Sequence, residues 1–160
     1  MRDKFADTEL KNLSKKGVFM VTDKKKEKEP DITFYHPDLL EVPGDGSPPY
    51  LKGYKCKKCG QIDFPKVSPC PSCWGEDFEM VPLSRKGKLY AYSHIFVAPP
   101  YLKPPYTMGY IDLPDNIRVF AQIEGEMGSF KCDEEMELTT GPIRINKDGL
   151  PITSYKFKKS

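Results

Sequence analysis

The sequence predicts an all-β chain in which a small metal-binding ribbon is followed by a five-stranded antiparallel barrel. Three observations support this prediction. Four of the five cysteines form two C-x-x-C pairs, which are typical of a metal-binding ribbon. The 160 residues include 16 prolines and 12 glycines, which interrupt the chain too often for long helices. From Gly87 onward, short runs of aromatic and β-branched residues favour strands.

The chain is predicted to have three parts that differ in composition. They are an N-terminal helix with an extended docking arm, a zinc ribbon, and a barrel with a C-terminal tail, at residues 1–49, 50–82 and 83–160. In the first part, Phe5, Leu10 and Leu13 recur at roughly helical spacing and predict a short amphipathic helix. One such helix cannot bury its apolar side alone, so we expect it to dock on the rest of the chain or on a partner.

Two segments follow the predicted helix. Residues 21–30 form a run of lysines and acids, which indicates a solvated surface linker rather than a binding patch. Residues 31–53 mix apolar residues with four prolines. This mixture is too apolar for pure disorder and too interrupted for a domain, so we expect an extended arm that lies on another surface.

The two cysteine pairs predict a metal site. Cys56 and Cys59 are separated from Cys70 and Cys73 by ten residues, and Gly60 follows the first pair, where a positive φ is often needed. Two C-x-x-C turns brought together place four sulfurs around one point, a rubredoxin-like cage that suits Zn²⁺ or a single iron. Because all four ligands come from the protein, we expect a structural Zn²⁺ rather than two disulfides or free thiols.

The ribbon is expected to contain a strand at residues 51–55 before the first cysteine pair and a segment at residues 62–65 after it. Trp74 directly follows the last cysteine. An aromatic residue at this place packs on the metal turn or offers a stacking platform to a ligand, and we expect packing.

The barrel is predicted from a long strand and several shorter ones with turn residues between them. The five predicted strands are residues 88–97, 108–113, 117–123, 135–138 and 142–145. Five short strands with a long first one fit an OB-type barrel. Residues 155–157 are expected to form an edge strand or a docked tail.

A proline-aromatic loop joins the first two predicted barrel strands. It contains Tyr101, Lys103 and Tyr106, which combine two flat rings with one cation. Loops at the ends of barrel strands often reach ligands. These three residues could hold a nucleotide-like group, with a ring on the base and the lysine on a phosphate, but a rigid loop packed on the barrel or on a partner is the interpretation that we favour from these residues alone.

The sequence predicts no catalytic residues of its own. His94 lies in a predicted strand and is expected to be a hydrogen-bonded sheet residue rather than a general base. Cys132 lies in a polar loop and is expected to have no catalytic role, since a thiolase-type nucleophile needs a histidine partner and an oxyanion hole. The sequence has no glycine-rich phosphate loop and no triad motif.

The composition restricts the class of partner. The formal net charge is only +2, which is weak for a nucleic-acid binder. No apolar run approaches the roughly 20 residues of a membrane span, and no signal peptide is evident. We therefore expect a cytoplasmic protein with reduced thiols, no membrane partner and no nucleic acid.

Beyond these separate patterns, the combination of motifs resembles a known family, the acyl-CoA-associated proteins of the domain of unknown function 35. The resemblance covers about residues 50–145. The matching residues are Cys56-x-x-Cys59-Gly60, Phe64-Pro65, Cys70-Pro71-x-Cys73, Leu83-Ser84-x-x-Gly87-x-Leu89-Tyr90-x-Tyr92, Pro100…Pro105-Tyr106 and Arg118-Val119-Phe120-Ala121.

This resemblance implies a non-catalytic subunit that docks on a thiolase-fold catalytic subunit, in a hetero-oligomer built on a thiolase dimer. It implies that the chain helps to form the CoA or acyl-CoA site for thiolytic C–C cleavage of a bulky CoA thioester, such as benzoylsuccinyl-CoA in anaerobic toluene degradation. Two alternatives remain at this point: a zinc-ribbon and OB-fold nucleic-acid binder, which predicts salt-dependent affinity, and a rubredoxin-like electron carrier, which predicts coloured iron in place of zinc.

Overall fold

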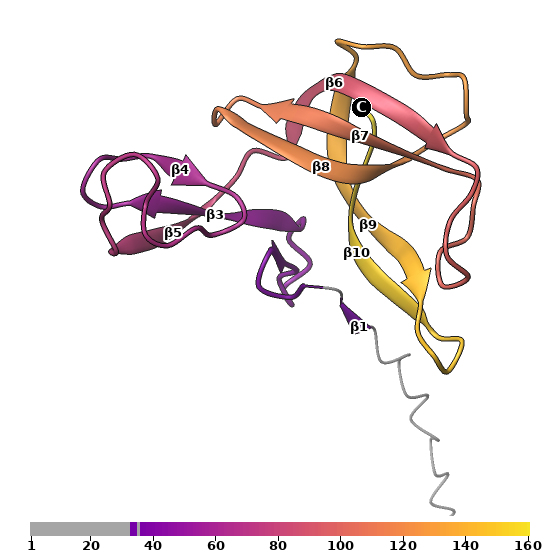
Figure 1. Ribbon diagram of the computed structural model, residues 1–160, viewed down its shortest axis with the longest axis horizontal. Coiled ribbons are helices and arrows are strands. Elements are labelled where there is room, and N and C mark those ends of the chain that lie inside the picture. The colour runs from indigo at the N-terminus through magenta and orange to yellow at the C-terminus, as the bar shows by residue number, and fades with distance from the viewer. Residues whose placement is uncertain (1–32, 35) are drawn as a thin grey trace, which may run out of the picture. The chain divides into compact units, whose positions relative to one another are not determined.

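The computed structural model describes residues 33–34 and 36–160, and these residues form strands and loops with no helix among them (Figure 1). The predicted N-terminal helix and the charged linker lie outside the described residues. Residues 31–160 form one compact unit. Within the described part of the chain, no helix is long and apolar enough to cross a membrane. The prediction of an all-β chain is confirmed for the described residues.

The zinc ribbon is built on strand β3, Tyr50–Cys56, to which three short strands pair in antiparallel fashion. They are β2 (Leu40–Glu41), β4 (Ile62–Asp63) and β5 (Phe78–Pro82). Strand β2 belongs to the predicted arm, and its Leu40 is buried against the ribbon, where Glu41 makes a 2.6 Å ion pair with Lys52. Strand β2 of the predicted arm therefore lies on this chain's own ribbon.

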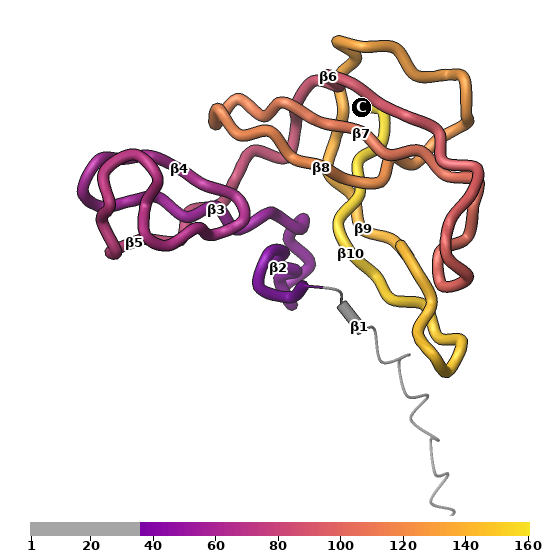
Figure 2. The backbone as a smooth tube through the Cα atoms, in the orientation of Figure 1, coloured from indigo at the N-terminus to yellow at the C-terminus, as the bar shows by residue number. Residues whose placement is uncertain are grey.

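The second part is a closed barrel of five strands, which confirms the prediction. The strands are β6 (Lys86–Ile95), β7 (Tyr106–Leu113), β8 (Ile117–Glu124), β9 (Glu135–Ile145) and β10 (Pro151–Lys159). Around the barrel the order is β10-β8-β7-β6-β9, and β9 pairs with β10 to close it. All of these pairings are antiparallel except that of β10 with β8. This is the Greek-key order of an OB barrel (Figure 2).

The fourth and fifth strands differ from the prediction. Residues 135–138 and 142–145 belong to the single strand β9, because Gly141 is extended and pairs with Ser154. The turn lies later, where Asn146 Oδ1 accepts hydrogen bonds from two backbone N–H groups and Gly149 has φ +79°. The true fifth strand is β10, which contains the predicted 155–157 segment and adds the parallel β1 (Thr33–Phe34) at its start.

Alternating side chains fill the barrel. On β8, Ile117, Val119, Ala121 and Ile123 are buried while the residues between them are more exposed, the period-2 pattern of a strand with one covered face. Phe157 of β10 is completely buried in the same cluster. The barrel core therefore depends on β10 as much as on the strands that were predicted from the sequence.

The segment between ribbon and barrel is held by Arg85. Its Nε donates to the carbonyl of Pro49 at 3.1 Å, its Nη2 donates to the carbonyl of Leu138 at 3.2 Å, and Nη2 also lies 3.2 Å from the carboxylate of Glu137. Ser84 N–H donates to Asp115 Oδ2 at 2.7 Å. These contacts restrict the segment between β5 and β6. The division of the chain into separate parts after residues 49 and 82 stays a prediction.

Two strands approach each other so closely at Gly109 that any side chain would collide. A Cβ there would lie 2.6 Å from Ile123 Cδ1 and 2.7 Å from the carbonyl oxygen of Ala91. We expect Gly109→Ala to lower the free energy of unfolding by about 2 kcal/mol, since overpacking displaces backbone as well as side chains. Urea unfolding measures the change, with Gly44→Ala as the control, because nothing lies within 4 Å of a Cβ at Gly44. Equal midpoints for the two variants would contradict the close packing.

Candidate functional site

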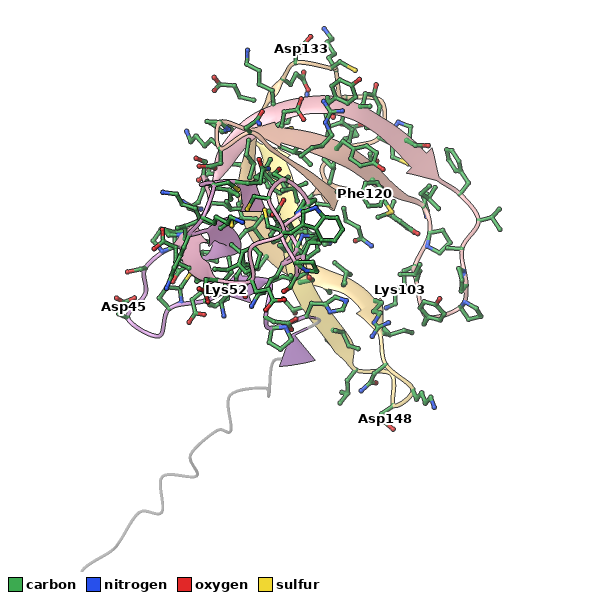
Figure 3. The ribbon with its side chains drawn as sticks, turned by 60° about the vertical axis from the view of Figure 1, so that its left-hand side comes forward. Asp45, Lys52, Lys103, Phe120, Asp133 and Asp148 are labelled. Atoms are coloured by element: carbon green, nitrogen blue, oxygen red, sulfur yellow. The ribbon has the colours of Figure 1, made fainter. Side chains whose placement is uncertain are left out.

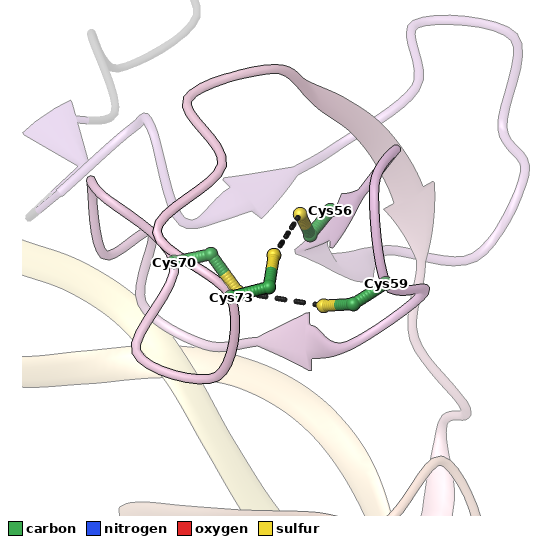
Figure 4. Close-up of side chains that lie close together, drawn as sticks. All are labelled: Cys56, Cys59, Cys70 and Cys73. Carbon is green, nitrogen blue, oxygen red and sulfur yellow. Dashed lines mark hydrogen bonds between the residues drawn. The ribbon is translucent and has the colours of Figure 1, made fainter.

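The four cysteines of the ribbon converge on one point (Figure 4). Their Sγ atoms all lie within 4.8 Å of one another, and the Cys56–Cys73 and Cys59–Cys70 pairs are 3.6 Å apart. Four sulfurs at tetrahedral corners 2.3 Å from a Zn²⁺ ion would be about 3.8 Å apart. No disulfide links them. The spacing of the sulfurs therefore fits one tetrahedral metal ion.

Each cysteine pair is shaped by a tight backbone turn. In the first turn, Gly60 N–H donates to the carbonyl of Cys56 at 2.8 Å, and Gly60 has φ +78°, which confirms the positive φ expected there. In the second, Trp74 N–H donates to the carbonyl of Cys70 at 2.9 Å, and Cys70 N–H donates to the carbonyl of Gly75 at 2.9 Å. Cys56 and Cys70 are fully buried. The two turns thus direct the four sulfurs toward one point.

The electrostatics of the four-cysteine cluster favour the binding of a cation. The backbone N–H of Cys59 lowers the pKa of the Cys56 thiol to about 7. At Cys59 the N–H of Gln61 acts in the same direction, but the crowded thiols of Cys73 and Cys70 outweigh it and raise the pKa of Cys59 to about 12. Four thiolates at this distance repel one another, and a divalent cation removes that repulsion. The donor set therefore suits a metal that prefers sulfur.

Trp74 does not pack against the metal turn as the sequence analysis predicts. Its side chain is 79% exposed, and its φ is +59°. Gly75, the next residue, has no room for a side chain, since a Cβ there would lie 3.2 Å from Cys56 Sγ and 3.4 Å from Cys73 Sγ. The chain stays close to the sulfurs through Gly75 and turns the indole outward, so the packing prediction is wrong for this residue.

The proline-aromatic loop lies at the end of the barrel where β6 leads to β7. It is anchored by a hydrogen bond of 2.9 Å from Ile145 N–H to the carbonyl of Tyr101. Beside it lies a cavity of about 330 Å³ whose aromatic lining residues are Tyr101, Tyr106, Phe120 and Tyr155 (Phe120 is labelled in Figure 3). We call it the aromatic cavity. Its volume is in the usual range for small-molecule sites.

A second cavity of about 350 Å³ shares part of its lining with the first, including Tyr106 and Arg144. Its cationic residues are Lys103, Arg144 and Lys156, and we call it the cationic cavity (Lys103 is labelled in Figure 3). No aspartate or glutamate is among the described residues that line either cavity. The structure thus places Tyr101 and Tyr106 at the first cavity, and Lys103 and Tyr106 at the second.

Several residues of these cavities were missed by sequence reasoning. Arg144 lies on β9 and Lys156 on β10, about 40 residues or more from the loop that they face across the cavities. The sequence places both residues only on possible strands and does not link them to the loop. Residues 155–157 were predicted to be an edge strand or a docked tail. Knowing that β10 closes the barrel is what brings Lys156 to the loop.

Two residues outside the ribbon, His94 and Cys132, were considered for a chemical role. His94 Nδ1 lies 2.8 Å from Thr107 Oγ1, and its ring lies against those of Tyr92 and Phe96, which confirms a hydrogen-bonded sheet histidine. Cys132 is exposed in the loop before β9. Within the described part of the chain, no hydrogen bond joins this thiol to a base.

A four-cysteine ribbon followed by a closed barrel of OB order defines a zinc-ribbon and OB-fold protein. Comparison with known families agrees: residues 46–79 match "ChsH2, rubredoxin-like zinc ribbon domain", and residues 80–140 match "ChsH2, C-terminal OB-fold domain". The chain belongs to this ChsH2 family. The sequence-based resemblance to the domain of unknown function 35 is confirmed by these matches and by the relatives that follow.

Several curated relatives are similar over most of their length. "Benzoylsuccinyl-CoA thiolase subunit BbsA" of Thauera aromatica is 68% identical over 136 residues, covering 85% of this chain and 94% of the relative. The protein of the same description in Geobacter metallireducens is 65% identical, covering 85% and 92%. A "DUF35 domain-containing scaffold protein" of Methanocaldococcus jannaschii is 41% identical, covering 68% and 80%.

One solved structure is similar in fold. A chain of the "Ltp2-ChsH2(DUF35) aldolase" matches with a TM-score of 0.59 and 20% sequence identity, covering 69% of this chain and 84% of that chain. At this identity the likeness concerns the fold alone.

Proposed function

We propose that this chain is the non-catalytic zinc-ribbon subunit of a thiolase complex. The observation that carries the proposal is the similarity to relatives described as benzoylsuccinyl-CoA thiolase subunits, which extends over more than 90% of their length at 65% and 68% identity. In this role the chain docks on a thiolase-fold subunit in the cytoplasm, in a hetero-oligomer built on a thiolase dimer. The partner supplies the nucleophile and the base for thiolytic cleavage of benzoylsuccinyl-CoA or a similarly bulky CoA thioester.

The proposed resident metal is a structural Zn²⁺ held by Cys56, Cys59, Cys70 and Cys73. The spacing of the sulfurs and the crowding of the thiols support it. With four protein ligands the ion has no open position for water or substrate, so its contribution is to keep the ribbon folded.

The proposed contribution to the acyl-CoA site is the loop that carries Tyr101, Lys103 and Tyr106. The two cavities beside this loop support it, since one offers aromatic rings and the other offers cations. A CoA thioester has a nucleotide with phosphates at one end and an acyl group at the other. Binding the nucleotide end on this chain leaves the thioester free to reach the partner's nucleophile.

Purification of the tagged chain from its native host tests the assembly. We expect a thiolase-fold protein to co-purify, as identified by mass spectrometry, and the reconstituted pair to cleave benzoylsuccinyl-CoA. The partner alone should be slower by about 100-fold, because a small misplacement of the substrate costs about that much in rate. Full activity of the partner alone, or cleavage by this chain without a partner, would refute the proposed role.

A further inference from the structure

The two metal turns of the ribbon are closed by the same hydrogen bond but carry different residues at one position. Gly60 follows Cys59, Trp74 follows Cys73, and both have a positive φ, +78° and +59°. Each N–H donates to the carbonyl of the first cysteine of its own pair, at 2.8 Å for Gly60 and 2.9 Å for Trp74. Glycine adopts this conformation without steric cost, whereas a tryptophan there is strained. The needs of the turn therefore do not explain the indole.

Trp74 is also unusual among the residues that have this backbone conformation. The other non-glycine residues with a positive φ in the described part of the chain are His36, Asn116 and Asp133. Histidine, asparagine and aspartate occur in the left-handed region several-fold more often than other types, while a bulky side chain there is an outlier. A strained residue that its own turn does not require points to a role outside the turn.

The turn that carries Trp74 is held firmly in place. Besides the bond from Trp74 N–H, Cys70 N–H donates to the carbonyl of Gly75 at 2.9 Å. On the other side, Lys58 Nζ donates to the carbonyl of Cys73 at 3.2 Å. Because these bonds fix the backbone of residue 74, little backbone freedom remains to be lost when the indole is covered by a partner.

The indole projects into solvent without a cavity beside it that could hold a small ligand. Trp74 is 79% exposed, and Phe96 is the next most exposed of the described aromatic side chains, at 66%. Trp74 lines neither the aromatic cavity nor the cationic cavity. Small ligands bind in concave sites, so a projecting indole fits a hollow on a macromolecule instead. Tryptophan is among the residues that most often dominate protein–protein interfaces.

Two other macromolecules fit this feature less well than a different protein does. Exposed aromatic rings also stack on single-stranded nucleic acid, but the net charge of +2 provides little of the long-range attraction that such a partner requires. In a two-fold pair of this chain the same surface must complement itself. A projecting side chain would then meet its own copy rather than a hollow.

We propose that Trp74 is the anchor by which the ribbon docks on the thiolase-fold catalytic subunit, with the indole buried in an apolar pocket of that subunit. This inference rests on the proposed function and adds a docking residue to it. Burying an indole removes about 150–250 Å² from water, which is enough for one residue to dominate an interface. The four cysteines then have two tasks, because the cluster that folds the ribbon also holds the turn that presents the anchor.

Fluorine NMR tests the anchor, because Trp74 is the one tryptophan of the sequence. The full zinc-containing chain, labelled with 5-fluorotryptophan, gives one resonance. We expect that resonance to shift and to lose most of its H₂O/D₂O isotope effect when the unlabelled catalytic subunit is added. Trp74→Gly should keep the zinc and unfold at the same or a higher urea concentration, as Gly60 indicates. It should weaken the complex at least about 30-fold, the loss typical of an interface hot spot, and Trp74→Phe should restore part of the affinity.

Met127→Ala is the control, because it removes a large exposed apolar side chain from a barrel loop that the proposed contact does not include. If the parent chain forms the complex but Trp74→Gly binds as tightly as Met127→Ala does, the anchor is wrong and the thiolase role stands. If the parent chain itself binds no thiolase-fold subunit, both are overturned. Loss of zinc from Trp74→Gly would show that the indole serves the turn. A resonance that moves with the concentration of this chain alone, or with a single-stranded oligonucleotide and not with the subunit, also overturns the inference.

Discussion

Replacing Cys70 with serine is expected to release the metal and unfold the ribbon. Besides the cysteines, only Leu40, Leu51 and Leu83 are buried hydrophobic residues in the described part of this region. So small a core does not offset the conformational entropy of ordering the chain. Binding of a structural zinc supplies about 10–16 kcal/mol in comparable small domains, so losing one ligand removes most of the stability. Metal content by mass spectrometry and thermal unfolding with and without a chelator measure the effect.

Cys132→Ser provides the matched control for this experiment. The substitution is chemically identical, but Cys132 is exposed and lies outside the cluster, so its effect should stay within about 0.5 kcal/mol. The barrel of the Cys70→Ser chain should keep its strands, since most residues of the shared core cluster lie on the barrel. Retention of one zinc ion per chain and an unchanged melting curve for Cys70→Ser would show that the ribbon does not depend on the metal.

The metal cluster could be predicted from the sequence because its chemistry is local. Each C-x-x-C pair forms one turn, and the positive φ of Gly60 belongs to the same turn. Only the meeting of the two turns is long-range, and the antiparallel pairing of β3 with β4 and β5 provides it. Trp74 was placed wrongly because its orientation follows from its own positive φ, which residue type alone does not reveal.

The first three barrel strands could be predicted because their apolar residues alternate, as on β8. The end of the barrel could not, for two physical reasons. The glycine at position 141 favours a break between two strands, but in the structure Gly141 is extended and leaves room for Lys156. The burial pattern of strand β10 does not alternate strictly, and its lysines resemble a polar tail.

The cavities depend on this same strand. Tyr101 and Lys103 were found because they are close in sequence and unusual in composition. Arg144, Tyr155 and Lys156 come together with them only once β9 and β10 have closed the barrel. A site assembled from a loop and two distant strands has no sequence motif, and it is visible only when the register of the strands is known.

The second large effect is expected for Phe157→Ala. Phe157 is completely buried near the end of β10, where this strand pairs with both β9 and β8. Removing a buried phenyl ring leaves a cavity and costs about 3–5 kcal/mol. Because small domains are stable by only about 5–15 kcal/mol, the variant should unfold at a much lower urea concentration than the parent chain.

Phe96→Ala is the control for the loss of a phenyl ring, since Phe96 is 66% exposed and the change there should stay within about 0.5 kcal/mol. If residues 155–157 were a docked tail, Phe157→Ala would detach the tail and leave a barrel with its full stability. The closed barrel requires instead that the loss of stability be global and cooperative, and that the cationic cavity disappear with it. Hydrogen exchange distinguishes the two cases, because a detached tail would expose only the amides of β10, whereas an opened barrel would expose those of β8 and β9 as well.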